Sequence, residues 1–416
     1  MRLLVLSAWF PFPADNGSKI RTHHLLRALA AEHEVDLIAF YREARELAAL
    51  REAQALCHRV AAFPKPAFDA ERLPHLGDLL SPLPRFVRTT YCTELARKTE
   101  EWRAHNDYHA VICMTWGMAP YLMSDSIGPA GGRVHRPEAR CSTRAILDQH
   151  NIESGIFRRG LRQSRGARRL RRWLTYQKFR RFEGRACAGF AACSVVSEQE
   201  RAELNRILPR SAGTRIVTIP NGVDTAWLRP RRDFTGQQAG RRRLVFTGSL
   251  SYGANLEGLR WFLRTIYPRL KVTYPGIELH ISGETWPGAV PEAEGDPAVV
   301  FAGYLEDLRP LLWGSEVLIA PLRLGGGTRL KILDAMAAGL PVVSTSVGAE
   351  GLQVEAQQHL LIADEPEAFA GAVGRVLDQP LRALAMAGRA RKLVEREYDW
   401  GPIGRSFIRL VEEVVG

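Results

Sequence analysis

A chain of 416 residues, of which 46% are hydrophobic and 25% are charged, is too long for one compact core and too apolar to be disordered, so we expect two globular domains. Twelve Arg or Lys and one acid, Glu183, give residues 158–185 a charge of +11, which is almost the whole net charge of +12. Six scattered cysteines without CxxC or His/Cys ligand spacing argue against a disulfide framework and a zinc site, and no apolar stretch approaches the ~20 residues that cross a bilayer.

The first apolar run, at residues 1–13, fits either a signal peptide or a buried strand. No small-residue cleavage site follows it, and Pro11 and Pro13 interrupt it, which favours the strand. Similar runs, typical of buried parallel strands, recur between helical patterns along the chain. The first series is 3–7, 35–40, 110–114, 145–149, 191–196 and 215–220, with helices beginning near Ile20, Arg42, Thr93, Gly117, Ile156 and Ser197. The second series is 243–249, 278–283, 299–303, 316–322 and 341–345.

The two series are separated by residues 220–243, which are rich in Pro, Gly and Arg and lack periodicity. We therefore place the linker between domains there. The predicted fold class is α/β, with two doubly wound, Rossmann-like parallel-sheet domains that face each other across a cleft. Ligands of such sheets bind beyond the carboxyl ends of the strands, so the cleft is the expected site.

The basic segment predicts an amphipathic helix. Its apolar residues recur at helical spacing and are Leu170, Trp173, Leu174, Phe179, Phe182 and Ala186. One interpretation is a solvated helix with one face on the core, and another is attraction to anionic lipid. Nucleic acid is disfavoured, because aromatic residues are not interleaved as stacking platforms and no binding motif accompanies the charge.

Three glycines, Gly325, Gly326 and Gly327, follow a predicted strand and precede an apolar helix. Such a turn lets a ligand approach the backbone, and the unpaired N–H groups of the helix start favour phosphate. Arg329 and Lys331 would oppose the helix dipole there unless an anion lies between them, although solvated cations on an ordinary glycine turn remain an alternative. No GxxxxGK[ST] loop is present, and no GxGxxG follows the first strand.

Taken together, several motifs resemble the retaining family-four glycosyltransferases of glycosyltransferase-B fold. They are GGGTRLKILDAMAAGLPVVSTSVGAEGL, IPNGVDTAWLRP, TGSLSYGANLEGLRWFL, SVVSEQE and FAGYLEDLRPLLWGSEVLIAPL. The resemblance implies an N-terminal acceptor-binding domain at 1–222, which contains the basic helix at 158–188, and a nucleotide-sugar donor-binding domain at 223–398. It also implies a helix at 399–416 that crosses back to the first domain.

The resemblance implies a donor site without a metal ion. The glycine turn with Thr328 would cradle the diphosphate and the donor sugar, and Gly248 and Ser249 would lie beside it. The base would contact Gly303, Tyr304 and Leu305, and Gly17 and Ser18 would approach the phosphates from the other domain. A carboxylate at Asp334 would contact ribose, although a plain surface acid is the alternative.

Two departures from the family pattern concern charge. Where many members carry a glutamate that contacts the donor sugar, this chain has Gly326, and where many carry an Arg and a Lys, it has Ser249 and Asn255. We infer that Arg329 and Lys331 replace the missing cations from the opposite side of the diphosphate. Both side chains are expected to face solvent or ligand, and both are assigned a catalytic role.

His150 ends a predicted strand and is therefore expected to face the cleft. A lone histidine is more often structural, but the family places one at this strand end near the transferred sugar, so His150 joins the predicted catalytic residues. Asn151 and Glu153 are expected to orient this histidine or the acceptor.

The expected function is retaining, metal-independent transfer of a sugar from a nucleotide-diphosphate donor to a hydroxyl, without a cofactor. The acceptor would be lipid-linked or a saccharide, in glycan or polysaccharide assembly, and no nucleic acid is involved. We expect a cytoplasmic protein with reduced thiols, and peripheral contact with the anionic inner face of the cell membrane through residues 158–185. The alternatives are a nucleotide-sugar 2-epimerase of the same fold and a non-catalytic basic binding protein.

Overall fold

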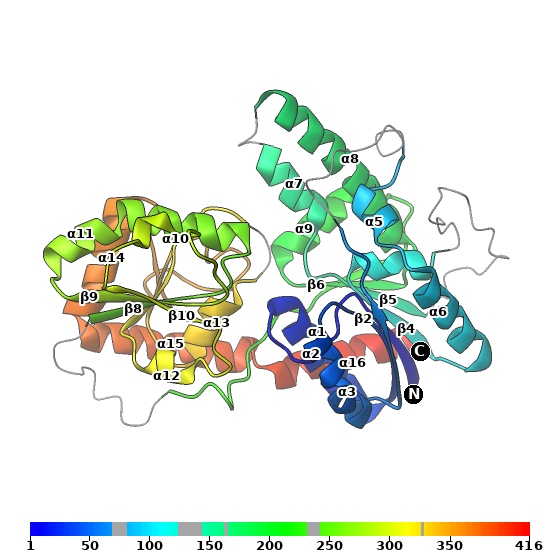
Figure 1. Ribbon diagram of the computed structural model, residues 1–416. Coiled ribbons are helices and arrows are strands. Elements are labelled where there is room, and N and C mark those ends of the chain that lie inside the picture. Colours follow the sequence, from blue (N-terminus) through cyan, green and yellow to red (C-terminus); the bar gives the residue numbers. More distant parts are fainter. Residues whose placement is uncertain (69–80, 124–143, 162–164, 231–241, 326–327) are drawn as a thin grey trace. The chain divides into compact units, whose positions relative to one another are not determined.

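The computed structural model describes residues 1–68, 81–123, 144–161, 165–230, 242–325 and 328–416. The chain forms two compact units, one made of Met1–Pro220 with Gly404–Gly416 and the other of Asn221–Ile403. Each unit contains one parallel sheet with helices packed against it (Figure 1). The predicted α/β class with two parallel-sheet domains is therefore confirmed.

The first unit is built on a seven-stranded parallel sheet with the order β3-β2-β1-β4-β5-β6-β7. Its strands are β1 (Arg2–Ser7), β2 (Glu34–Tyr41), β3 (Arg59–Pro64), β4 (Ala110–Met114), β5 (Ala145–Asp148), β6 (Ala192–Val195) and β7 (Arg215–Thr218). Six of them match the predicted runs. The exception is β3, an edge strand that is only partly buried and so lacks the continuous apolar run of a central strand.

Ten helices of the described chain belong wholly or mainly to this unit. They are α1 (Gly17–Glu32), α2 (Ala44–Ala48), α3 (Leu50–Leu56), α5 (Arg85–Thr89), α6 (Thr93–His105), the 3₁₀ helix η1 (Trp116–Tyr121), α7 (Glu153–Leu161), α8 (Gly166–Ala188), α9 (Glu198–Ile207) and α16 (Trp400–Val415). The helix expected near Gly117 is the short η1, which contains Pro120; a proline cannot donate the backbone hydrogen bond that would extend it as an α-helix.

The basic segment forms two helices, α7 and α8, and its predicted apolar face is buried only in part. Phe179, Phe182 and Ala186 of α8 are buried, whereas the side chains of Leu170 and Trp173 are 61% and 45% exposed. The reason is length: 23 residues of helix extend about 34 Å, and only the second half of α8 reaches the core. Of the two interpretations of this helix, a face packed on the core therefore holds only for its second half.

The second unit has a six-stranded parallel sheet with the order β10-β9-β8-β11-β12-β13. Its strands are β8 (Arg242–Thr247), β9 (Ile277–Ser282), β10 (Val299–Gly303), β11 (Val317–Ala320), β12 (Val342–Ser344) and β13 (Leu361–Ile362). Leu244 and Phe246 pack into one apolar cluster and Val245 into another, because both faces of the sheet are covered. This double burial explains why the predicted strands read as continuous apolar runs; the two-residue β13 was missed.

The helices of the second unit lie on both faces of this sheet. They are α10 (Gly253–Thr265), α11 (Tyr267–Thr273), η2 (Pro291–Ala293), α12 (Arg309–Trp313), α13 (Leu330–Ala337), α14 (Pro366–Asp378) and α15 (Pro380–Glu397). None of the helices in the described ranges is long and apolar enough to pass through a lipid bilayer.

The strand order reverses direction between β1 and β4 in the first sheet and between β8 and β11 in the second. Open parallel sheets bind their ligands at such reversals, beyond the carboxyl ends of the strands. The described cysteines form no disulfide with one another; Cys141 lies outside the described residues.

Candidate functional site

Lys331, in the first turn of α13, reaches the carboxyl end of β8. Its Nζ donates a hydrogen bond to Asn255 Oδ1 at 2.9 Å, and Asn255 Nδ2 donates to the Ser249 carbonyl at 2.8 Å. Gly248, which directly precedes Ser249, has φ 120°, and a Cβ there would lie 3.1 Å from the Lys331 Nζ. This turn therefore requires glycine for both conformation and space. Lys331 thus brings a positive charge to the two positions, 249 and 255, where the family's Arg and Lys are missing.

Arg329 immediately precedes α13 and is buried, with 6% of its surface exposed. Of the two expected environments, solvent is excluded by this burial, and contact with a ligand stays a prediction. A Cβ built on Gly325, whose φ is 113°, would lie 3.0 Å from both Arg329 Nη2 and the Tyr252 hydroxyl. The guanidinium thus folds back along the loop that precedes its own helix, a placement that no local sequence pattern indicates.

The glycine turn itself is described only at its two ends, because Gly326 and Gly327 lie outside the described residues. At one end is Gly325 with its left-handed backbone. At the other end the Thr328 hydroxyl is buried and makes no hydrogen bond with any residue of the described chain. A buried hydroxyl without a partner costs free energy, and a ligand oxygen would supply the missing hydrogen bond.

Two ionisable groups of α13 titrate near neutral pH. Burial, with the nearby charge of Arg329, lowers the pKa of Lys331 to about 7. Burial raises the pKa of the Asp334 carboxyl to about 7. Because Lys331 and Arg329 are cations close to each other, an anion bound between them would restore the full charge of the lysine.

The residues expected to contact the base lie at the carboxyl end of β10. Gly303 ends β10 with φ 67°, and its carbonyl accepts hydrogen bonds from Gly283 N at 2.8 Å and Ser282 Oγ at 3.1 Å. Tyr304 is half exposed, and Leu305 packs against the core. The predicted donor residues of the second unit therefore gather at the carboxyl ends of β8, β10 and β11.

In the first unit, the carboxylate of Asp148 at the end of β5 organises a buried polar cluster. It accepts hydrogen bonds from Arg21 Nε and Nη2 at 2.9 and 2.6 Å and from Ser194 Oγ at 2.6 Å, and it lies 3.1 Å from His150 Nε2. Burial opposes its ionisation, but Arg21 and His150 outweigh this and hold its pKa well below the usual value. The cluster fixes the position of His150, which is 7% exposed.

His150 and Ser18 both line a cavity of about 1260 Å³ whose described lining residues all belong to the first unit. The cavity opens where three strands end, because Trp9 follows β1, Trp116 follows β4 and His150 follows β5. Its other described lining residues include Asn151 and Glu153, several aromatic rings, and a set of Arg and Lys side chains. Gly17 is exposed at the first position of α1.

The one acid of the basic segment has a structural role that the sequence did not reveal. Glu183 is buried, and its two carboxylate oxygens accept hydrogen bonds from the backbone N–H groups of Glu153 and Ser154 at 2.7 and 2.9 Å. It thereby satisfies the free N–H groups at the start of α7. Burial raises the pKa of Glu183 to about 8. This contact joins α8 to the rim of the cavity.

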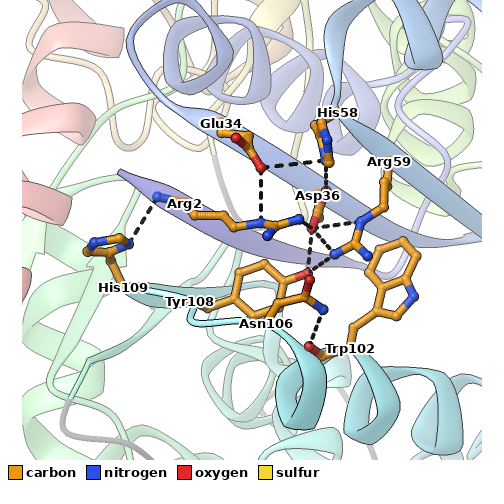
Figure 2. Close-up of polar contacts among 9 residues, drawn as sticks. All are labelled: Arg2, Glu34, Asp36, His58, Arg59, Trp102, Asn106, Tyr108 and His109. Atoms are coloured by element: carbon orange, nitrogen blue, oxygen red, sulfur yellow. Dashed lines mark hydrogen bonds and ion pairs between the residues drawn. The ribbon is translucent and has the colours of Figure 1, made fainter.

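Another buried carboxylate, Asp36, lies near the amino end of β2, and Figure 2 shows its polar contacts. It accepts hydrogen bonds from Arg59 and Tyr108 at 2.5 Å and from Arg2 at 3.4 Å, and it lies 3.0 Å from His58 Nδ1. Arg2, Asp36 and Arg59 stand near the amino ends of β1, β2 and β3, and Tyr108 just before β4. This cluster ties four strands together at the sheet end away from the cavity, which indicates a structural role.

Each of the two units contains a segment that matches a known protein-family model. Residues 15–227 match the model described as Glycosyltransferase Family 4, and residues 241–379 match the model described as Glycosyl transferases group 1. An uncharacterized 44.6 kDa protein from the cps region of Klebsiella pneumoniae is 23% identical over 96% of both chains.

One further relative matches about half of the chain, and one solved structure matches nearly all of it. A phosphatidyl-myo-inositol mannosyltransferase from Propionibacterium freudenreichii is 28% identical over 48% of this chain and 51% of that protein. The solved structure of Anabaena HepE in complex with UDP and glucose aligns with a TM-score of 0.68 and 14% identity, over 99% of this chain and all of the other. At this identity the structural likeness shows the fold.

Proposed function

The chain belongs to glycosyltransferase family 4, has the glycosyltransferase-B fold and is a glycosyltransferase, and we propose that it transfers sugar from a nucleoside diphosphate sugar with retention of configuration and without a metal ion. The donor would bind at the strand ends of the second unit. That the similar protein HepE was solved with UDP and glucose supports a nucleotide-sugar donor.

The observation that carries the donor assignment is the placement of Lys331. Its ammonium lies on Asn255, where the family's own cation is absent, and Arg329 and the unbonded Thr328 hydroxyl accompany it. Two cations and a hydroxyl donor at a helix start suit a diphosphate. They would also neutralise the charge on the leaving group, the task that a divalent metal performs elsewhere.

In the proposed reaction the bond between the anomeric carbon and the diphosphate oxygen breaks. The acceptor oxygen forms a new bond to that carbon on the same face, and the acceptor proton passes to an oxygen of the departing diphosphate. Lys331 and Arg329 stabilise the negative charge that develops on this diphosphate, which is usually the largest contribution to such a rate. His150, held by Asp148, positions the acceptor or the transferred sugar.

The acceptor would bind in the cavity of the first unit, whose lining includes His150 and Ser18. We propose a lipid-linked or saccharide acceptor and a role in glycan or polysaccharide assembly. The relative from the cps region and the phosphatidyl-myo-inositol mannosyltransferase support this proposal by similarity.

The first half of α8 supports peripheral binding to an anionic membrane. Leu170 and Trp173 are exposed there, and the arginines around them, among them Arg168 and Arg172, are exposed as well. Apolar side chains among basic ones are what an interfacial helix presents to lipid, and each basic residue near the surface contributes ~1 kcal/mol.

A thermal-shift screen of free nucleoside diphosphates, followed by a transfer assay with the matching sugar donors, tests the function. Ligand at one hundred times its dissociation constant should stabilise the fold by ~2.7 kcal/mol. The anomeric configuration of the product, measured by NMR, tests retention, and activity in excess chelator tests metal independence. Binding without transfer would favour a non-catalytic protein, and a changed configuration at the second carbon of the donor sugar would favour the 2-epimerase.

A further inference from the structure

The cavity of the first unit carries a strong excess of positive charge. Its described lining includes eight Arg and Lys side chains and a single carboxylate, that of Glu153. Burial and the neighbouring Glu200 raise the pKa of Glu153 to about 7, so near neutral pH this carboxyl is charged only part of the time. This excess of positive charge favours an anionic ligand over a neutral one.

Two of these cations are held on one aromatic ring. The Nζ of Lys65 lies 3.5 Å from the centroid of the Trp9 ring, and the Cζ of Arg42 lies 4.7 Å from it. Lys65 Nζ also donates a hydrogen bond to the carbonyl of Ala8 at 2.8 Å. The nearby acid, Glu46, is already engaged, because its carboxylate accepts from Arg42 N and pairs with Lys19 Nζ, both at 2.5 Å.

The two cations on this ring repel each other. Burial and the charge of Arg42 lower the pKa of Lys65 to about 7, although Glu46 acts in the opposite direction. An anionic group bound beside the two side chains would remove their mutual repulsion and strengthen both contacts. Lys65 and Arg42 directly follow β3 and β2, at the sheet edge where ligands of this fold bind.

Helix α8 contributes further cations to the cavity. Arg165, Arg168 and Arg171 line it and are exposed, and no carboxylate in the described chain lies within 4.0 Å of their guanidinium groups. Arg168 and Arg171 stand in the half of α8 that exposes Leu170 and Trp173, and Arg165 directly precedes this helix. Positive charge therefore continues from the strand ends out to the exposed apolar residues of this helix.

An aromatic wall accompanies the charges. Phe86 packs against Phe68 and Trp116 with ring centroids 5.0 and 5.4 Å apart, and Phe179 packs against Trp116 and Phe157 at 5.3 and 5.0 Å. All five rings line the cavity. Such a row of rings offers apolar surface to a hydrocarbon chain.

We propose that the acceptor of this enzyme is an anionic amphiphile, in which a phosphate or diphosphate links an apolar chain to the sugar that carries the accepting hydroxyl. The phosphate would lie on Lys65 and Arg42, and the chain along the aromatic wall toward the exposed half of α8. The hydroxyl would then be near His150, which lines the same cavity. This inference rests on the proposed transfer reaction and selects the lipid-linked class over free saccharides.

Calorimetric binding of three probes tests this proposal: geranyl diphosphate, geraniol and inorganic diphosphate. The wild-type protein should bind geranyl diphosphate at least ~10-fold more tightly than either of the others, because only this probe uses both the cations and the aromatic rings. The double variant Lys65→Met with Arg42→Gln should lose ~10-fold or more of that affinity. A matched control, Arg97→Gln, removes an exposed charge of α6 and should change nothing.

Nucleoside diphosphate affinity of the same variants separates this proposal from the proposed function. It should be unchanged in the double variant, which also shows that the variant is folded and that the effect is not at the donor site. Equal affinity for geraniol and geranyl diphosphate, or an unaffected double variant, would overturn the proposal. Inorganic diphosphate that binds as tightly as the lipid, with an affinity that the double variant loses as well, would assign the cations to a free anion and would also overturn the proposal. Absence of any nucleoside diphosphate binding would instead count against the donor assignment.

Discussion

The ammonium of Lys331 is hydrogen-bonded to the side chain of Asn255, 76 positions earlier in the chain, at 2.9 Å. A cation from α13 thereby stands beside the start of α10, where the family pattern would place a lysine of its own. We therefore expect the two positions to act together, so that a charge lost from one can be supplied by the other.

Lys331→Ala should reduce turnover ~10²- to 10³-fold, because one stabiliser of a developing anion is typically responsible for that much. Adding Asn255→Lys should restore part of the loss, since the new ammonium would lie close to the one removed. Steady-state transfer or donor hydrolysis measures both, with circular dichroism as the folding control. Near-wild-type turnover of Lys331→Ala would mean that the diphosphate is held elsewhere.

The affinity for nucleoside diphosphate should fall as the pH rises from about 6 to 9. The free Lys331 has a pKa of about 7, so it is a cation below that pH and neutral above it, and binding must then take up a proton. Arg329 faces this lysine, and Asp334, with its own pKa of about 7, becomes an anion over the same range. Lys331→Arg stays charged and isolates the contribution of the lysine: its pH profile, measured by calorimetry, should be flatter. Superimposable profiles would show that Lys331 does not contact the phosphates.

His150→Ala should lower turnover while nucleoside diphosphate affinity stays within a few fold, because the imidazole lines the cavity of the first unit, whereas the cations assigned to the diphosphate, Arg329 and Lys331, belong to the second unit. His150→Gln, which keeps a hydrogen-bonding side chain, should retain more turnover than alanine. Single-turnover kinetics and calorimetry give the two values. If turnover is unchanged while thermal stability falls, the histidine only completes the cluster around Asp148.

Vesicles that contain anionic lipid should bind the protein, and neutral vesicles should not. Flotation should decline steeply as NaCl rises from about 0.05 to 0.5 M, because salt screens the arginines of α8. Leu170→Ser with Trp173→Ser should weaken binding ~10-fold by removing the exposed apolar side chains. Leu381→Ser, which changes a leucine that is 82% exposed in the second unit, is the matched control. Equal flotation with both lipids at low salt would contradict electrostatic docking.

Asp36→Asn should lower the free energy of unfolding by about 3 kcal/mol, because it leaves the buried donors around this carboxylate without their charge partner. Hydrogen bonds from Arg59, Tyr108 and His58 outweigh the effect of burial and lower its pKa in the folded state. Its ionised form therefore stabilises the wild type above the ordinary pKa near 4, and this stability is lost as the pH falls below it. Urea unfolding at pH 7 and pH 3 should show a smaller difference between variant and wild type at the lower pH.

The central strands could be predicted because both faces of each sheet are covered, so the strands are continuous apolar runs. The half-buried strand β3 gives no such signal and was not predicted. As a result, a cation at its carboxyl end was not recognised as a candidate ligand-binding residue. Lys65 directly follows β3 and Arg42 directly follows β2. With β3 recognised, Lys65 would have joined Arg42 at the carboxyl ends of predicted strands, where open parallel sheets bind their ligands.

The candidate donor site could be predicted from the sequence only in part, for a different reason. The glycine turn and the unusual cations could be read locally, because a helix start and its dipole are local features. The hydrogen bond from Lys331 to Asn255 and the burial of Arg329 depend on how α13 packs beside β8, which no spacing within the turn contains. The role of Glu183 was hidden for the same reason, since its partners are backbone groups 29 and 30 residues away.

The chain order of the two units means that the second is an insertion into the first. Asn221–Ile403 is one continuous stretch, whereas the first unit needs both Met1–Pro220 and the end of α16. That end is packed closely: a Cβ on Gly404 would lie 2.7 Å from the Cβ of Ala28 in α1, and Phe407 is completely buried. Genetic exchange of residues 221–403 would therefore replace the half assigned to the donor without cutting the core of the half assigned to the acceptor. A fragment that stops at residue 220 would expose that core.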